Sequence, residues 1–300
     1  ECLPKKRLQV VKLEKPSFQK PLLGVPPLGG ENVGLAPVPG GHNDIVVSLY
    51  DIMRAPVTLQ QDDIRLIKYI QEKYLYPPSI AAYNLKHPDN EDPSIGQSTQ
   101  IRNILGDKVE NGFFIECGAL DGETRSNTLV FEKRLGWKGV LIEADPKNFG
   151  LVMEKNRKAH AVSACLSTEP YPNKVMFEQN FNIGKISNLQ ANQQQVKGYA
   201  EVQCLPLYSI LLALNRTSVD YFSLDVEGMD LQVLQTIPWN KIDIKTLSVE
   251  FYHDDEGKGT LRKFMEEKGY TVYTEVTHPN NYANDFIFYR NDIIPKIPKA

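Results

Sequence analysis

Short apolar runs alternate with amphipathic segments through the C-terminal two-thirds of the chain. The apolar runs are typical of buried strands, and the amphipathic segments between them have helical spacing. Repeated strand–helix units predict a mostly parallel sheet covered by helices on both faces. The seven expected strands lie at 113–115, 140–142, 159–164, 221–224, 246–249, 270–276 and 286–289.

The predicted helices begin and end at residues that suit helix termini. Ser126 can cap a helix that continues to Leu135, and Pro146 suits the first turn of the next one. Other helices are expected at 59–75, 97–105, 207–214, 229–236 and around 261–265. The helix at 59–75 has a capping-box pattern at Thr58 and Gln61. Its expected apolar stripe consists of Ile64, Ile67, Ile70 and Tyr74.

The first part of the chain does not show this alternation of apolar runs and amphipathic segments. Six prolines and six glycines fall between residues 16 and 41, a composition that disfavours both helix and strand. We expect an extended leader or stalk at 1–57, a helical extension at 58–107 and a Rossmann-like domain at 108–292. Residues 166–219 interrupt this domain before its fourth strand, and we expect them to form a wall or lid beside a ligand.

Composition and charge narrow the function classes. The net charge is −3, without the basic surplus that usually accompanies binding to nucleic acid. No segment approaches the roughly 20 apolar residues that span a bilayer. Because the sequence begins at Glu1 rather than at Met, a signal peptide or membrane anchor can precede it.

The cysteines leave the compartment open. Their spacing is too wide for a zinc cluster, and Cys117 is expected to be a buried free thiol. Cys165 and Cys204 can pair if the chain is lumenal or extracellular, which is one of several possible pairings. The tripeptide Asn215-Arg216-Thr217 is a glycosylation sequon compatible with a secretory glycoprotein, although such tripeptides also arise by chance.

Candidate chemistry gathers where the first two strands end. After the first strand the chain reads Glu116-Cys-Gly118-Ala-Leu-Asp121-Gly122, and a glycine turn here lets backbone approach a ligand. The second strand ends in Glu143, where a carboxylate can accept hydrogen bonds from both hydroxyls of a ribose. The alternative is a simple turn and a surface acid. Together the two features favour a cofactor that contains adenosine.

The chemistry of the turn discriminates between such cofactors. A nicotinamide site requires G-x-G-x-x-G and a pyrophosphate at a helix N-terminus. This turn reads G-x-x-x-G and is acidic, which suits a ligand without phosphate and with a positive amino-acid end. S-adenosyl-L-methionine (SAM) is such a ligand.

Several ordered motifs resemble the FkbM-type methyltransferase domain over about residues 95–290. The resemblance implies a Rossmann-like class I fold, SAM as cofactor, and O-methylation of sugar or other hydroxyl groups. The motifs are residues 112–122, Ser126-Asn127-Thr128, residues 136–146, residues 223–228, residues 248–251 and Asn284-Asp285-Phe286.

Position within these motifs gives each candidate residue a role. Around the methionine end of SAM we expect Glu116, Gly118, Ala119, Asp121 and Gly122. Glu143 and its neighbour Ala144 are expected at the ribose, and Ala164 and Cys165 beside the adenine. Asp225 and Glu227 are expected near the transferred methyl group.

A hydroxyl acceptor also needs a base to take its proton. Asp225 and His253 are the candidates for this base, because each follows a predicted strand of the same sheet edge. Alternatively, Asp225 and Glu227 cap the following helix, and His253 belongs to a solvated acidic loop. We expect no resident metal, although Asp225, Asp254 and Asp285 could meet in space.

Two functions from different classes remain. The first is a SAM-dependent O-methyltransferase that acts on a glycan or small-molecule hydroxyl. The second is a degenerate domain that binds a secretory client protein, because the chain also resembles Star-type proteins, membrane proteins of the secretory pathway with this domain on the lumenal side. The second would place the chain in the lumen of the endoplasmic reticulum or Golgi, as the ectodomain of a type II membrane protein. Fold alone does not decide between them.

Overall fold

The computed structural model describes residues 59–181, 184–187, 197–251 and 257–298. The chain divides into two units, 1–45 and 46–300, and the described residues all belong to the second unit. None of the helices in this described part combines the length and the apolar character that a bilayer crossing requires.

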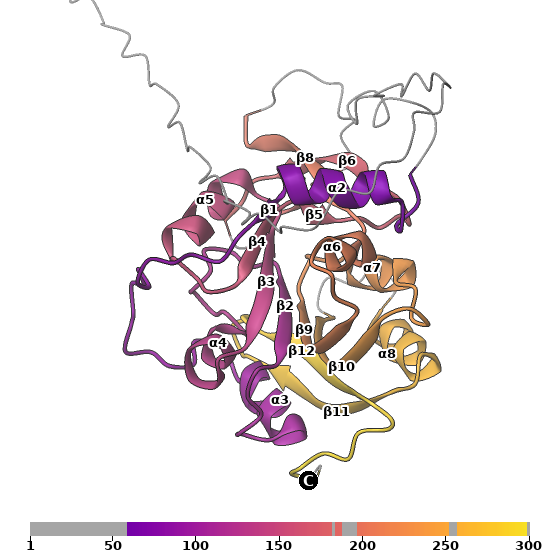
Figure 1. Cartoon of the computed structure of the whole chain (residues 1–300). Helices are drawn as coiled ribbons and strands as arrows, with labels where there is room; N and C mark the ends of the chain where they lie inside the picture. Colours follow the sequence, from indigo (N-terminus) through magenta and orange to yellow (C-terminus); the bar gives the residue numbers. More distant parts are fainter. Residues whose placement is uncertain (1–58, 182–183, 188–196, 252–256, 299–300) are drawn as a thin grey trace, which may run out of the picture. The chain divides into compact units, whose positions relative to one another are not determined.

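An eight-stranded sheet forms the centre of this unit, in the order β1-β4-β3-β2-β9-β10-β12-β11 (Figure 1). β2, β3, β4, β9 and β10 pair in parallel, and β12 is antiparallel to both β10 and β11. The seven predicted strands and the mostly parallel sheet are thus confirmed. Their bounds are β2 (Phe113–Cys117), β3 (Lys138–Glu143), β4 (His160–Ser163), β9 (Ser218–Leu224), β10 (Asp243–Glu250), β11 (Tyr270–Thr277) and β12 (Asn284–Arg290).

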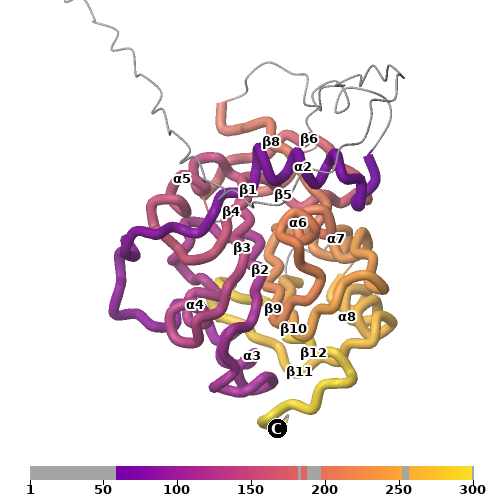
Figure 2. Tube along the Cα trace, viewed as in Figure 1, coloured from indigo at the N-terminus to yellow at the C-terminus, as the bar shows by residue number. Residues whose placement is uncertain are grey.

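The eighth strand, β1 (Leu75–Tyr76), was missed because two residues are too short for a periodic pattern. It adds an antiparallel edge beside β4. The segment that follows β1 then passes along the side of the sheet that carries α4 and α5 (Figure 2). Hydrogen bonds from Ser79 N–H to Arg157 O and from Asn84 N–H to Lys155 O, each 3.0 Å long, hold it there.

Helices cover both faces of the sheet, as predicted. Alternate residues of β2 point to opposite faces: Phe113 and Ile115 belong to one core, and Phe114 belongs to the other. Figure 1 shows α4 and α5 on one side and α6, α7 and α8 on the other. The helices are α2 (Ile64–Lys73), α3 (Gln97–Leu105), α4 (Leu129–Leu135), α5 (Pro146–Glu154), α6 (Leu207–Ala213), α7 (Asp230–Thr236) and α8 (Lys258–Glu267).

The start of α2 differs from the prediction. Its N-cap is Asp63, whose side chain accepts from Arg65 N–H, and Thr58 lies outside the described residues. Ile64 of the expected stripe is 60% exposed, whereas Leu66 and Ile70 are fully buried. Ile64 lies two residues before Leu66, about 200° around the helix, so it faces away from the packed side, and the predicted stripe was wrong at its first position.

The insertion contains a second sheet of four strands, in the order β5-β8-β6-β7. Its strands are β5 (Cys165–Leu166), β6 (Asn173–Glu178), β7 (Lys185–Ser187) and β8 (Tyr199–Leu205). The sequence predicted only the end of β8, because β5 and β7 have two and three residues, and the three apolar residues of β6 stand together between polar ones without alternation. A disulfide between Cys165 and Cys204 joins β5 to β8, and Cys117 is a buried free thiol.

Candidate active site

A cavity of about 370 Å³ lies at the carboxyl ends of β2, β3, β9 and β10. Open α/β sheets usually bind their ligands at this edge. The loops that follow these strands line the cavity together with the start of α3 and the loop before β12. The second sheet adds a wall through Phe177, Phe181, Gly184 and Ile186.

A tight turn after β2 forms one side of the cavity. The N–H groups of Gly118 and Ala119 both donate to the carbonyl of Ile142, at 3.1 and 3.2 Å. Gly118 has φ +82°, and a Cβ atom there would lie 2.2 Å from the carbonyl oxygen of Asp225. Only glycine therefore permits this approach between the end of β2 and the end of β9.

Glu143 lies opposite this turn and lines the cavity. One carboxylate oxygen accepts from Leu120 N–H and the other from Asp145 N–H, both at 2.8 Å. The side chain thus faces the turn, as the pocket predicted from the sequence requires. Burial raises the pKa of Glu143 to about 7, and the two backbone N–H groups oppose this rise.

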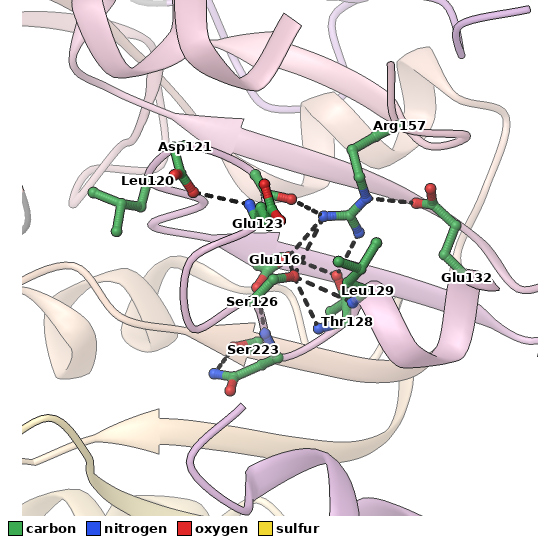
Figure 3. Close-up of polar contacts among 12 residues, drawn as sticks. Glu116, Leu120, Asp121, Glu123, Ser126, Thr128, Leu129, Glu132, Arg157 and Ser223 are labelled. Carbon is green, nitrogen blue, oxygen red and sulfur yellow. Dashed lines mark hydrogen bonds and ion pairs between the residues drawn. The ribbon is translucent and has the colours of Figure 1, made fainter. Parts of the chain in front are cut away.

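Glu116 has a different environment from the one expected (Figure 3). Its carboxylate accepts from Asn127 N–H at 2.6 Å, from Ser126 Oγ at 2.9 Å and from Thr128 Oγ1 at 2.6 Å. Burial raises the pKa of Glu116, while the Arg157 guanidinium 4.0 Å away and these donors oppose the rise. Because protein donors surround the carboxylate, Glu116 shapes the loop before α4 rather than presenting a free carboxylate to an ammonium group.

Arg157 completes this network, and sequence reasoning missed it (Figure 3). It is 3% exposed. Its guanidinium donates to Glu132 at 3.1 Å, to the carbonyl of Gly122 at 2.5 Å and to Thr128 Oγ1 at 3.2 Å. One buried cation thereby ties the turn after β2 to α4. In the sequence it lies in a polar run that resembles solvated surface, so no local pattern indicates its role.

Acidic side chains also line the cavity near the ends of β9 and β10. Asp225 and Glu227 follow β9, and Glu250 ends β10 directly across from Asp285 of β12. Burial, followed by the charge of Asp225, raises the pKa values of Glu227 and Asp285 to about 7 and that of Glu250 to about 11. The sequence did not identify Glu250 as a site residue, although its position at a strand end beside Asp225 could have indicated it.

The remaining predicted residues divide into three groups. Ala119, Ala144, Ala164 and Cys165 line the cavity. Asp121 and Gly122 are not among the lining residues. The Asp121 carboxylate accepts from the N–H groups of the next turn, Glu123 and Thr124, and Gly122 faces α5 instead. His253 and Asp254 lie outside the described residues.

The rim of the cavity carries an aromatic and an amide surface. Tyr282 is 51% exposed, and its ring stacks on His278 with 4.9 Å between the ring centroids. The Arg125 guanidinium lies 5.3 Å from the centroid of the Tyr282 ring. Two buried polar atoms of lining residues, Asn127 Oδ1 and Asn284 Nδ2, have no hydrogen-bond partner among the described residues.

This fold and this site define a Rossmann-like methyltransferase of class I, a class that takes its methyl group from SAM. The sequence model of the Methyltransferase FkbM domain matches residues 116–272, more than half of the 300 residues. The chain therefore belongs to the FkbM methyltransferase family. None of the curated proteins matches it.

Solved structures resemble the chain remotely. The FkbM methyltransferase of Methylobacillus flagellatus is 15% identical, with a TM-score of 0.43 over 63% of this chain and 47% of the other. The chain thus matches just under half of that protein. The human methyltransferase 10 domain containing protein is 11% identical, with a TM-score of 0.40 over 76% of this chain and 95% of the other.

Proposed function

We propose that the chain is a SAM-dependent O-methyltransferase whose acceptor is a hydroxyl group of a glycan or small molecule. The observation that carries this proposal is one cavity in which the Gly118 turn and Glu143 face acids from β9, β10 and β12. In such a cavity one part can bind a nucleoside and another part can accept a proton.

The residues of the cavity fit SAM in charge. Arg125 is the one basic residue among the described residues that line it. SAM has no phosphate and carries a sulfonium and an ammonium group, so an acidic lining suits it. Asn127 Oδ1, which lacks a partner in the described part, can accept from that ammonium group. Besides Glu116, whose carboxylate is held by protein donors, the acids that line the cavity are Glu143, Asp225, Glu227, Glu250 and Asp285.

Residues that line the cavity also fit the adenosine part of SAM. Each Glu143 oxygen accepts one backbone N–H, which leaves each a further lone pair for a ribose hydroxyl. Leu166, Phe177 and Ile186 of the second sheet, with Ala164 directly before it, provide apolar surface for a flat base.

Glu227 is the residue that we assign as the base. Bound SAM supplies an electrophilic methyl group, and the chain must take the proton of the acceptor hydroxyl. A pKa of about 7 suits this task near neutral pH, whereas Glu250, with a pKa of about 11, holds its proton there. Glu227 also has φ +54°, a left-handed conformation that is unfavourable for a non-glycine residue. Asp225 assists by raising the pKa of Glu227.

The rim supports a sugar-like acceptor. The half-exposed Tyr282, packed with His278 and Arg125, offers aromatic surface, and the neighbouring cavity residues Asn280 and Asn281 carry amide groups. Ligand sites commonly combine such a surface with a few polar groups that fix orientation.

Incubation with SAM labelled in its methyl group tests the proposal. We expect label in hydroxyl-bearing glycans or small molecules, and its loss in Glu227→Gln while SAM binding persists. The matched control is Glu154→Gln, an exposed acid of α5, which should leave transfer unchanged. Transfer at an undiminished rate by Glu227→Gln would overturn the assignment of the base. A protein that binds SAM and methylates no acceptor would favour the protein-binding function.

A further inference from the structure

The loop between α6 and β9 contains the tripeptide Asn215-Arg216-Thr217, the one Asn-X-Ser/Thr sequon in the 300 residues. Neither the cavity nor the methyl transfer involves this loop. Asn-linked glycosylation requires such a tripeptide on an exposed segment, with a middle residue other than proline. Whether Asn215 can be modified therefore depends on its folded context.

The local geometry leaves both functional residues of the sequon accessible. Asn215 lies in the turn that ends α6 with φ +53°, and both it and Thr217 are exposed. The fold anchors the loop through other groups. Arg216 places its guanidinium 4.7 Å from the centroid of the Phe113 ring, and the carbonyl of Thr217 accepts from Asp243 N–H at 2.8 Å. A bulky group on Asn215 would therefore extend into solvent without displacing a packed side chain.

The disulfide between Cys165 and Cys204 is an independent observation about the compartment. Disulfides form and persist in oxidising environments such as the endoplasmic reticulum, and they are rare in the cytosol. Cys117, the free thiol of the described part, is buried. Asparagine-linked glycans are attached in the same oxidising compartment, so the disulfide and the sequon point to one location.

We propose that Asn215 carries an Asn-linked glycan and that the chain enters the secretory lumen. This inference is independent of the proposed methyl transfer. The donor is an oligosaccharide linked to a polyprenyl diphosphate. A bond forms between Asn215 Nδ2 and the anomeric carbon of the sugar while the bond from that carbon to the diphosphate oxygen breaks. The diphosphate leaves with the bonding electrons, and the amide nitrogen loses one proton.

The position of the glycan leaves the cavity open. Asn215 precedes β9, whereas Asp225 follows it, and the seven residues of β9 rise about 3.3 Å each. The glycan would thus lie about 20 Å from the edge that binds SAM. Glycosylated and deglycosylated protein should therefore bind SAM with equal affinity.

Expression of the full chain behind a signal sequence in insect cells tests the proposal. Treatment with peptide N-glycosidase should lower the mass by one glycan and convert Asn215 to aspartate, which peptide mass spectrometry locates. Thr217→Ser keeps the sequon and should keep the glycan, whereas Thr217→Ala should lose it.

If Thr217→Ala does not accumulate, Asn215→Gln provides the same comparison. An unmodified Asn215 in secreted wild-type protein would overturn the proposal, as would a glycan that persists in Thr217→Ala or Asn215→Gln.

Discussion

Replacement of Arg157 by methionine tests the network that holds the turn after β2. The substitution keeps an unbranched apolar stem in place of the arginine stem. It removes a guanidinium that donates to Glu132 and Thr128 and lies 4.0 Å from Glu116. Removal of one partner from a buried ion pair costs about 3–5 kcal/mol, because the remaining charge stays buried without compensation. Since a domain of ordinary stability has only about 5–15 kcal/mol in total, the effect should be large. Urea unfolding followed by tryptophan fluorescence measures it.

A double-mutant cycle separates lost charge pairing from lost packing. In the variant Arg157→Met with Glu132→Gln both charges are absent, so its destabilisation should be smaller than the sum of the two single effects by about 1–3 kcal/mol. SAM affinity should also fall in Arg157→Met, because the network fixes a loop that borders the cavity. An Arg157→Met protein within about 1 kcal/mol of the wild type would refute this reasoning.

Three further predictions concern stability. As the pH falls from 7 towards 4.5, the ligand-free protein should gain stability through Glu143, whose pKa rises from 4.5 to about 7 on folding, so the folded state binds more protons in this range. Urea melts of Glu143→Gln should show a smaller gain, which Glu227 and Asp285 still provide, and a gain as large as that of the wild type would count against this role. Gly118→Ala should abolish folding or cofactor binding, because its Cβ would lie 2.2 Å from the carbonyl oxygen of Asp225. Gly150→Ala in α5, with open space around it, should raise the free energy of unfolding by about 0.5–1 kcal/mol. Equal effects of the two substitutions in thermal melts would contradict the account of the turn. The Cys165–Cys204 disulfide closes a loop of 39 residues, so its reduction should lower the free energy of unfolding in urea by roughly 4 kcal/mol. If oxidised and reduced protein were equally stable, a structural role of the disulfide would be excluded.

Elements with strong periodic patterns or terminal signals could be predicted from the sequence. The helix Gln97–Leu105 has the predicted bounds, and Asp145 caps α5 directly before Pro146 at its first turn. These features depend on local chemistry, which a single sequence carries. The second sheet was mostly missed, because β6 and β7 gain their order from pairing rather than from an apolar pattern of their own.

The sequence predicts those parts of the candidate site that lie directly at the ends of strands. Glu143 faces the Gly118 turn because both lie at the carboxyl edge of adjacent parallel strands. The roles of Glu116 and Arg157 were not predictable, since they depend on partners 10 to 41 residues away whose meeting only tertiary structure determines. Glu250 faces Asp285 through antiparallel register, which a sequence does not reveal either.

Calorimetric titration with SAM tests the central claim, that the Gly118 turn and Glu143 form the two sides of a nucleoside site. Wild-type protein and the control Glu154→Gln should bind SAM with equal, micromolar or tighter affinity, and Glu143→Ala should give no measurable heat while it remains folded by circular dichroism. Undiminished binding by folded Glu143→Ala, or no binding by the wild type, would contradict the claim.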